Sequence, residues 1–93
     1  MAGADTPRPL AVIVAAYQSA STVGGVVSGV RRALPGASIY VVDDGSTDGT
    51  AGAVTGATVI AHARNQGKGA ALASGISRAV ADGAAVLATL DAD

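Results

Sequence analysis

The chain has 93 residues, a net charge of −1, 49% hydrophobic residues and no cysteine. Charged residues make up only 14% of it, which is too few for a disordered chain of this hydrophobicity. Its six basic residues are scattered, which argues against a nucleic-acid-binding surface, and the lack of cysteine excludes disulfide frameworks and thiolate metal sites. The uncharged stretch 10–30 is interrupted by polar residues and glycines, so we expect no transmembrane segment. The lack of cysteine fits a reducing compartment, and we expect a cytoplasmic location.

The first half of the chain predicts a strand followed by a helix. We expect residues 1–9 to form a disordered leader. Leu10–Ala16 is a continuous apolar run of strand length, typical of a strand that is buried on both faces. From Thr22 to Leu34 the apolar residues recur at helical spacing, with Ser21 or Thr22 as the N-cap, and Pro35-Gly36 ends the helix.

The middle of the chain predicts two further strands. Ser38–Val42 is rich in β-branched and aromatic residues, as is typical of a strand, and Asp43–Gly49 has the composition of a loop. Thr50–Thr55 is expected to form a short helix that Gly52 interrupts. Thr58–Ala61 predicts the third strand.

The last third predicts a loop, a helix and a strand. After the loop His62–Gly69, the apolar residues Leu72, Ile76, Ala79 and Val80 share one helical face, and Gly83 is placed as a C-cap glycine. Ala85–Leu90 predicts a fourth strand, which we expect at an exposed edge.

Strands alternating with helices predict an α/β fold with the element order βαβαβαβ and a parallel, Rossmann-like sheet. With a strand order of 3-2-1-4, the topology reverses between the first and fourth strands, and ligands of such sheets bind at the strand carboxyl ends beside that point. Tyr17, the pair Asp43 and Asp44, and the pair Asp91 and Asp93 all follow strand ends, so we expect them to converge on one crevice.

Two acidic motifs carry the chemistry of this crevice. The Asp43-Asp44 pair can accept hydrogen bonds from a nucleoside, although a loop that uses Asp, Ser and Thr for turns and caps fits the same pattern equally well. Asp91-Ala92-Asp93 can hold a divalent cation together with phosphate oxygens.

A third motif, Asn65-Gln66-Gly67-Lys68-Gly69, precedes a helix. Its backbone N–H groups and its lysine favour an anion, and glycines that ease a loop against the sheet explain the pattern equally well. Nothing in the sequence marks His62 as a ligand or a base.

Read together, the segments 12–27, 40–50 and 63–93 resemble the N-terminal half of GT-A glycosyltransferases of the inverting family-2 group, and polyprenyl-phosphate (dolichol-phosphate type) mannosyl- and glucosyltransferases in particular. The resemblance implies a nucleotide-binding half, residues 10–93, cut immediately after the Asp-x-Asp motif. It also implies Mg²⁺ or Mn²⁺ on Asp91 and Asp93. The positions that correspond to the nucleotide-binding motifs of the family are Ala15, Tyr17, Ser19, Val42, Asp44, Lys68, Asp91 and Ala92. Of these, Ala15 and Ser19 stand where the family has proline and glutamate.

The resemblance further implies hexosyl transfer from a GDP- or UDP-sugar to a polyprenyl phosphate or similar acceptor, by a protein that lies peripherally at the membrane face. We expect the isolated 93 residues to be inactive, because the acceptor half of the family fold is absent from them. The alternatives are a catalytically silent nucleotide- and metal-binding module, and a receiver-like signalling domain. The latter is disfavoured because such domains place paired acids after the first strand, where this chain has Tyr17.

Overall fold

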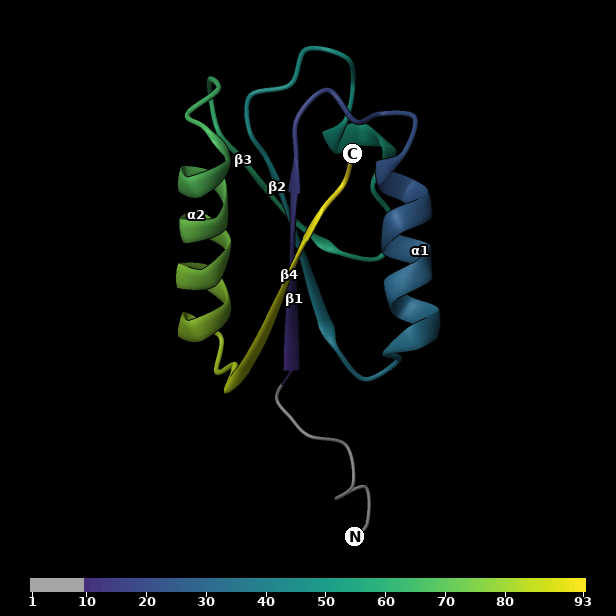
Figure 1. Cartoon of the computed structure of the whole chain (residues 1–93), viewed down its shortest axis with the longest axis vertical. Coiled ribbons are helices and arrows are strands. Elements are labelled where there is room, and N and C mark those ends of the chain that lie inside the picture. Colours follow the sequence, from purple (N-terminus) through teal and green to yellow (C-terminus); the bar gives the residue numbers. More distant parts are fainter. Residues whose placement is uncertain (1–9) are drawn as a thin grey trace, which may run out of the picture.

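The computed structural model describes residues 10–93, which form one parallel sheet with a helix on each face (Figure 1). The strands are β1 (Leu10–Ala16), β2 (Ser38–Asp43), β3 (Thr58–Ala61) and β4 (Val86–Asp91). The other elements are α1 (Val23–Ala33), η2 (Ala51–Ala53) and α2 (Lys68–Ala81). The strand order is β3-β2-β1-β4 and all neighbours are parallel, which confirms the predicted topology. The predicted leader, residues 1–9, lies outside the described residues.

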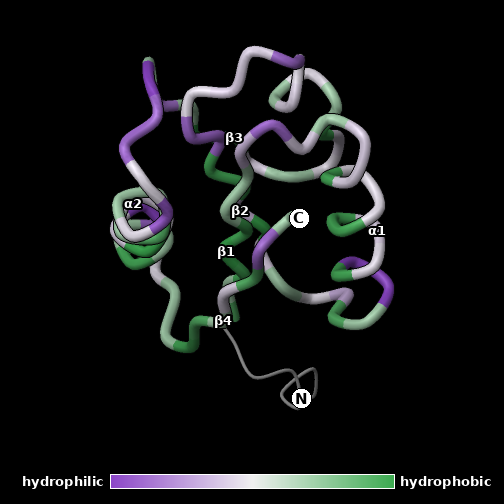
Figure 2. Tube along the Cα trace, turned by 45° about the horizontal axis from the view of Figure 1, so that its top comes forward, coloured by the Kyte–Doolittle hydropathy of each residue, from purple (hydrophilic) through white to green (hydrophobic). Residues whose placement is uncertain are grey.

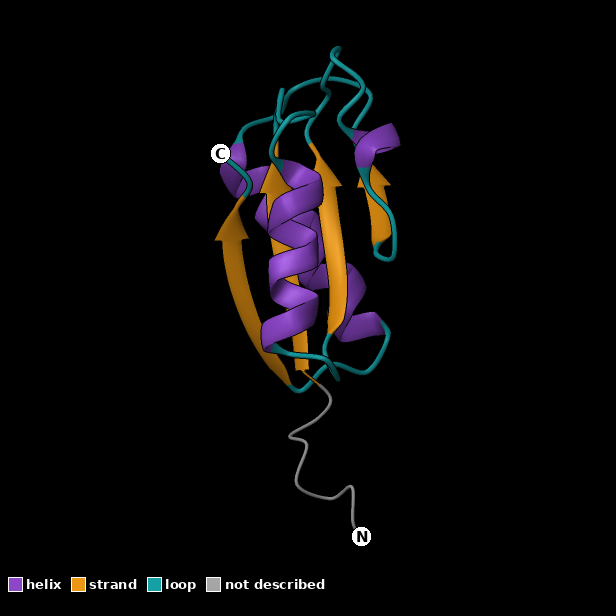
Figure 3. Cartoon of the chain, turned by 90° about the vertical axis from the view of Figure 1, so that its right-hand side faces the viewer, coloured by secondary structure: helices purple, strands orange, loops and turns teal. Residues whose placement is uncertain are grey.

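The alternation of side chains along β1 divides the core into two layers. Val12, Val14 and Ala16 face α1, where they pack with its valines. Ala11, Ile13 and Ala15 face α2 and pack with small residues of that helix. The two helices therefore cover opposite faces of the sheet (Figure 3), as right-handed crossovers on either side of β1 require. Hydrophobic residues concentrate in the central strands, whereas the loops at the strand carboxyl ends are more hydrophilic (Figure 2).

The predicted element boundaries differ from the structure by one or two residues, with one larger exception. The short helix expected over Thr50–Thr55 is only a 3₁₀ turn, Ala51–Ala53, because Gly52 lies within it and the Thr50 hydroxyl is engaged by the Ser19 N–H at 2.9 Å instead of capping. Thr22 is the N-cap of α1 but makes no capping bond, since its hydroxyl donates to the Ala92 carbonyl at 2.8 Å.

The two sheet edges are unequal. β3 is a short edge strand, whereas β4 forms the other edge with all six of its residues exposed, as expected for the fourth strand. Asp43 and Asp91, which were expected in loops, are the last residues of β2 and β4. Both carboxylates therefore lie at the edge of the sheet where the parallel strands end. Within residues 10–93, no helix is long and apolar enough to cross a membrane.

Candidate functional site

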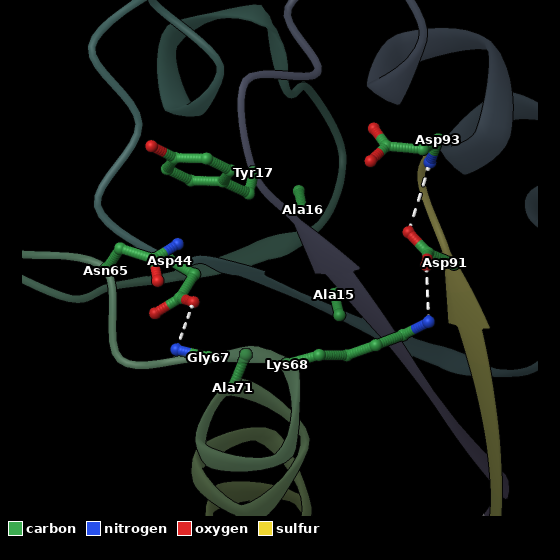
Figure 4. A pocket seen from close by; sticks show the side chains of 10 residues that line it. All are labelled: Ala15, Ala16, Tyr17, Asp44, Asn65, Gly67, Lys68, Ala71, Asp91 and Asp93. Carbon is green, nitrogen blue, oxygen red and sulfur yellow. Dashed lines mark hydrogen bonds and ion pairs between the residues drawn. The ribbon is translucent and has the colours of Figure 1, made fainter.

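A cavity of about 270 Å³ lies at the carboxyl ends of β1, β2 and β4 (Figure 4). Strand register brings its walls together, because Ala15 of β1 pairs with Val42 of β2 on one side and with Asp91 of β4 on the other. The N-terminus of α2 closes the cavity from one side of the sheet. The lining residues are Ala15, Ala16, Tyr17, Asp44, Asn65, Gly67, Lys68, Ala71, Asp91 and Asp93.

The adjacent carboxylates of Asp43 and Asp44 are both buried, and hydrogen bonds offset the cost of placing them side by side. Asp43 accepts from the backbone N–H of Ser46 at 3.0 Å, which closes the turn after β2. Asp44 accepts from the backbone N–H groups of Gln66 and Gly67, each at 2.9 Å. The loop before α2 therefore does bind an anion through its backbone, and that anion is the side chain of Asp44.

His62 completes the environment of Asp44. Its Nδ1 lies 2.8 Å from Asp44 Oδ1, and its Nε2 lies 2.8 Å from the hydroxyl of Ser74 on α2. The side chain of His62 is 9% exposed and that of Asp44 is 4% exposed, so the contact is largely shielded from water. A chain of hydrogen bonds thus runs from α2 through His62 to the carboxylate that lines the cavity.

The ionisation of Asp44 makes stability depend on acid pH. Burial alone would raise the pKa of this carboxyl, but the hydrogen bonds from His62, Gln66 and Gly67 outweigh burial and hold the pKa below its usual value of 3.8. Because the pKa is lowered in the folded state, the contribution of the ionised Asp44 to the free energy of unfolding is fully present above pH 3.8 and is lost as the pH falls below that value. Urea unfolding between pH 5 and pH 2.5 is expected to show this loss.

The matched variant for this prediction is Asp44→Asn. It removes the titrating group, so the free energy of unfolding should depend less steeply on pH in this range than it does in the parent chain. Asp48 and Asp91 also have lowered pKa values, through the Thr50 hydroxyl and through Lys68 respectively, so part of the slope should remain. An unchanged slope in Asp44→Asn would contradict the assignment.

The loop after β1 is fastened to the loop after β2. The Gln18 backbone N–H donates to the Ser46 hydroxyl at 2.9 Å, and the Gln18 side chain accepts from the Thr47 N–H at 2.7 Å. Asp48 accepts from the Ala20 N–H at 3.0 Å. Gln18 has a φ of 52°, the only positive value at a non-glycine residue in the described part of the chain, and these bonds hold it there. These bonds therefore tie the loop that carries Tyr17, a lining residue, to the loop after β2.

The Asp-x-Asp segment lies on the other side of the cavity. The Lys68 ammonium is 2.5 Å from Asp91 Oδ2, and this pair lowers the pKa of the Asp91 carboxyl. Asp93 Oδ1 accepts from the Ser19 hydroxyl at 2.5 Å, while the Asp93 N–H donates to Asp91 Oδ1 at 3.2 Å. The Asp91 carboxylate thus lies between the Lys68 ammonium and the backbone N–H of Asp93 (Figure 4), while the Asp93 carboxylate is bonded to Ser19.

Comparison with protein-family models gives a match to glycosyl transferase family 2 over residues 11–93. The chain belongs to this family. A comparison with curated proteins finds no match. The family match covers all of the sheet except Leu10, the first residue of β1, and it includes every residue that lines the cavity.

Most residues predicted for nucleotide binding do meet in this family 2 chain. Ala15, Tyr17, Asp44, Lys68 and Asp91 line the cavity, together with the predicted metal ligand Asp93. Tyr17 is 45% exposed, and its ring lies on the same side of the cavity as Asp44 (Figure 4).

Three predicted residues do not line the cavity. Ser19 is a buried residue of the loop after β1, Val42 lies in the core facing α2, and Ala92 packs in the layer facing α1. Ser19 acts on the site indirectly, through its bond to Asp93. Direct nucleotide contact by these three residues stays a prediction.

Sequence reasoning missed His62 and Ser74. They lie 18 and 30 positions after Asp44, and neither belongs to a recognisable motif. The register of the sheet would have indicated His62. Asp43 pairs with Ala61, so the residues that directly follow these two strand ends, Asp44 and His62, are neighbours. Without that register, a single histidine in a loop has no visible partner.

Proposed function

We propose that this family 2 domain binds a nucleotide diphosphate sugar and acts in hexosyl transfer to a polyprenyl phosphate or similar acceptor. The observation that carries the proposal is the cavity at the strand carboxyl ends, where an aromatic ring, a buried carboxylate, a lysine and two further carboxylates meet. This is the position where open parallel sheets bind nucleotides. Family membership supports the type of reaction.

The nucleoside would occupy the end of the cavity formed by Tyr17 and Asp44. Tyr17 offers an exposed aromatic face on which a base can stack, and Asp44 offers a hydrogen-bond acceptor that the neighbouring loop already holds in place. A ligand bound there would reach across Gly67 and Lys68 at the N-terminus of α2, where the positive end of the helix dipole and the Lys68 ammonium favour phosphate.

The donor set at Asp91 and Asp93 fits Mg²⁺ or Mn²⁺. These ions prefer oxygen ligands, and Mg²⁺ in particular is held by one or two carboxylates together with substrate phosphates. Residues 10–93 contain no group of three acidic or histidine side chains around one point, so the diphosphate would have to complete the coordination. When bound, the cation supplies positive charge that stabilises the departing diphosphate. Lys68 adds a second positive charge beside the same carboxylate.

The acceptor is proposed from the resemblance to polyprenyl-phosphate transferases. A lipid phosphate is already an anionic nucleophile, so a strong general base is not required of the chain. Such an acceptor would place the protein in the cytoplasm, peripherally at the membrane face. We expect residues 1–93 alone to bind donor without transferring sugar, because the residues that line the cavity are all assigned to nucleotide, phosphate and cation, and none is assigned to the acceptor.

Calorimetric titration of UDP and of GDP, each with and without Mn²⁺, tests the proposal. We expect binding that requires Mn²⁺ and that falls at least about tenfold in both Asp44→Ala and Asp91→Ala, since each removes a charged hydrogen-bonding or metal-binding group. Asp82→Ala is a suitable control, because Asp82 lies at the far end of α2 and contacts Tyr40 and Arg78 instead of the cavity.

Two results would contradict different parts of the proposal. If the folded chain binds neither nucleotide, the assignment of the cavity is wrong. If nucleotide and Mn²⁺ bind but the sugar of a UDP- or GDP-hexose is never transferred to a polyprenyl phosphate, even by a longer chain that contains residues 1–93, the domain is a silent binding module.

A further inference from the structure

The hydrogen-bonding capacity of Asp44 is almost filled by the protein itself. An ionised carboxylate has about four acceptor positions, two on each oxygen. Oδ1 accepts from His62 Nδ1 at 2.8 Å and from the Gln66 N–H at 2.9 Å, which uses both of its positions. Oδ2 accepts from the Gly67 N–H at 2.9 Å, which uses one. One acceptor position, on Oδ2, is therefore left for a ligand in the cavity that Asp44 lines.

Ser74 and His62 ensure that Oδ1 stays filled. In the neutral imidazole, the Ser74 hydroxyl donates to Nε2, so Nδ1 carries the hydrogen and donates it to Asp44. In the imidazolium, both nitrogens carry hydrogen, and Nδ1 again donates to Asp44. The arrangement is that of a serine–histidine–aspartate relay, but here the carboxylate, and not the serine, lines the nucleotide cavity.

Nucleotide bases differ in how many N–H groups they present to a carboxylate. The imide edge of uracil presents one N–H, at N3. The corresponding edge of guanine presents two, at N1 and at the 2-amino group, and a carboxylate binds both only when each of its oxygens has a free acceptor position. Against an Asp44 whose Oδ1 is full, the second N–H of guanine would be buried without a partner, which is the strongest means by which a polar site rejects a ligand.

We propose that the site selects uracil nucleotides over guanine nucleotides, and that His62, held by Ser74, is the residue that sets this choice. The inference rests on the proposed function, since it concerns the base end of the same cavity. His62 and Ser74 are positioning residues, because neither lines the cavity and both act through Asp44. The donor would then be a UDP-sugar.

The first experiment needs no variant. The chain is titrated with UDP, GDP and N3-methyl-UDP in the presence of Mn²⁺. We expect UDP to bind at least about tenfold more tightly than either of the others, because methylation removes the single N–H that Asp44 can accept. The 5-methyl analogue of UDP keeps N3–H and adds a methyl group elsewhere on the ring, so it controls for steric effects and should bind as UDP does.

The second experiment tests the role of the relay. His62→Leu frees a position on Oδ1, and we expect the ratio of UDP to GDP affinity to fall severalfold. His62→Asn places an amide N–H where Nδ1 stood and should restore the ratio. Ser74→Ala releases the ring and should lower the ratio less than His62→Leu does. Ser77→Ala is the matched control on α2, because Ser77 makes no bond to His62, and it should leave the ratio unchanged.

The outcomes separate this inference from the proposed function. Equal affinity for UDP and GDP, or tighter binding of GDP, would overturn the selectivity while leaving a nucleotide site in place. Tight binding of N3-methyl-UDP would overturn the role of Asp44 as the acceptor for the base. Binding of no nucleotide would overturn both proposals. Should His62→Leu not fold, Ser74→Ala and the ligand series still decide the matter.

Discussion

Replacing Gly45 with alanine is expected to cause the largest loss of stability of any single methyl addition at the site. Gly45 has a φ of +79°, and a Cβ there would lie 2.4 Å from the backbone carbonyl carbon of Arg64 and 2.4 Å from the Asn65 nitrogen. These are backbone atoms, so they cannot avoid the added Cβ by a simple rotation as a side chain could. The strained φ costs about 1–2 kcal/mol, and the overlap brings the expected loss to about 3 kcal/mol or more in urea unfolding.

Gly49 provides the matched control in the same loop. Its φ is +87°, but a Cβ there would meet nothing within 4 Å. Gly49→Ala should therefore show only the conformational cost of the positive φ, about 1–2 kcal/mol. Gly45→Ala should also weaken nucleotide binding, because moving 64–65 displaces the Gln66 and Gly67 N–H groups that hold Asp44. Similar stabilities for the two variants would show that the close approach at Gly45 is not a constraint.

The second large effect is expected at Gly75, in the middle of α2. A Cβ there would lie 2.4 Å from Ile13 Cγ2 and 3.0 Å from Val42 Cγ2, and both of these side chains are fully buried. Alanine would push α2 away from the sheet, at a cost of about 1–3 kcal/mol for overpacking. The gain in helix propensity, about 1 kcal/mol, offsets only part of this cost.

Gly29 is the control for Gly75, because it lies within α1 and a Cβ there would meet nothing within 4 Å. Gly29→Ala should stabilise the chain by about 0.5–1 kcal/mol through helix propensity alone. Thermal or urea unfolding of the two variants is expected to give shifts of opposite sign. A stabilised Gly75→Ala would mean that α2 packs less tightly on the sheet than the structure indicates.

The fold could be predicted from the sequence because each element carries a strong local pattern. The apolar run Leu10–Ala16 is typical of a strand buried on both faces, and the valines of α1 repeat at helical spacing. The exception was Thr50–Thr55, where a hydrogen bond from Ser19, 31 positions earlier, determines what Thr50 does. Local sequence does not contain such a contact.

The site could be predicted only where chemistry and strand ends coincide. Asp44, Asp91 and Asp93 follow or end strands, so parallel topology alone brings them to one edge. The partners of these carboxylates were not predictable. His62 reaches Asp44 because two loops from adjacent strands lie against each other. Lys68, the first residue of α2, reaches Asp91 at the end of β4. These contacts depend on register and loop conformation, which no motif specifies.

The layer between α2 and β1 has a consequence for how this domain tolerates mutation. Ala71, Gly75 and Ala79 are buried small residues along one face of α2, and Ala71 also forms part of the cavity wall. In a deep mutational scan scored on ligand capture, enlarging any of them should be as damaging as altering an acidic residue, although Gly75 and Ala79 have no functional group and no contact with the cavity. Such a scan would thus score this face of α2 as functional although it carries no reactive group, because the shape of the cavity depends on how closely α2 packs against the sheet.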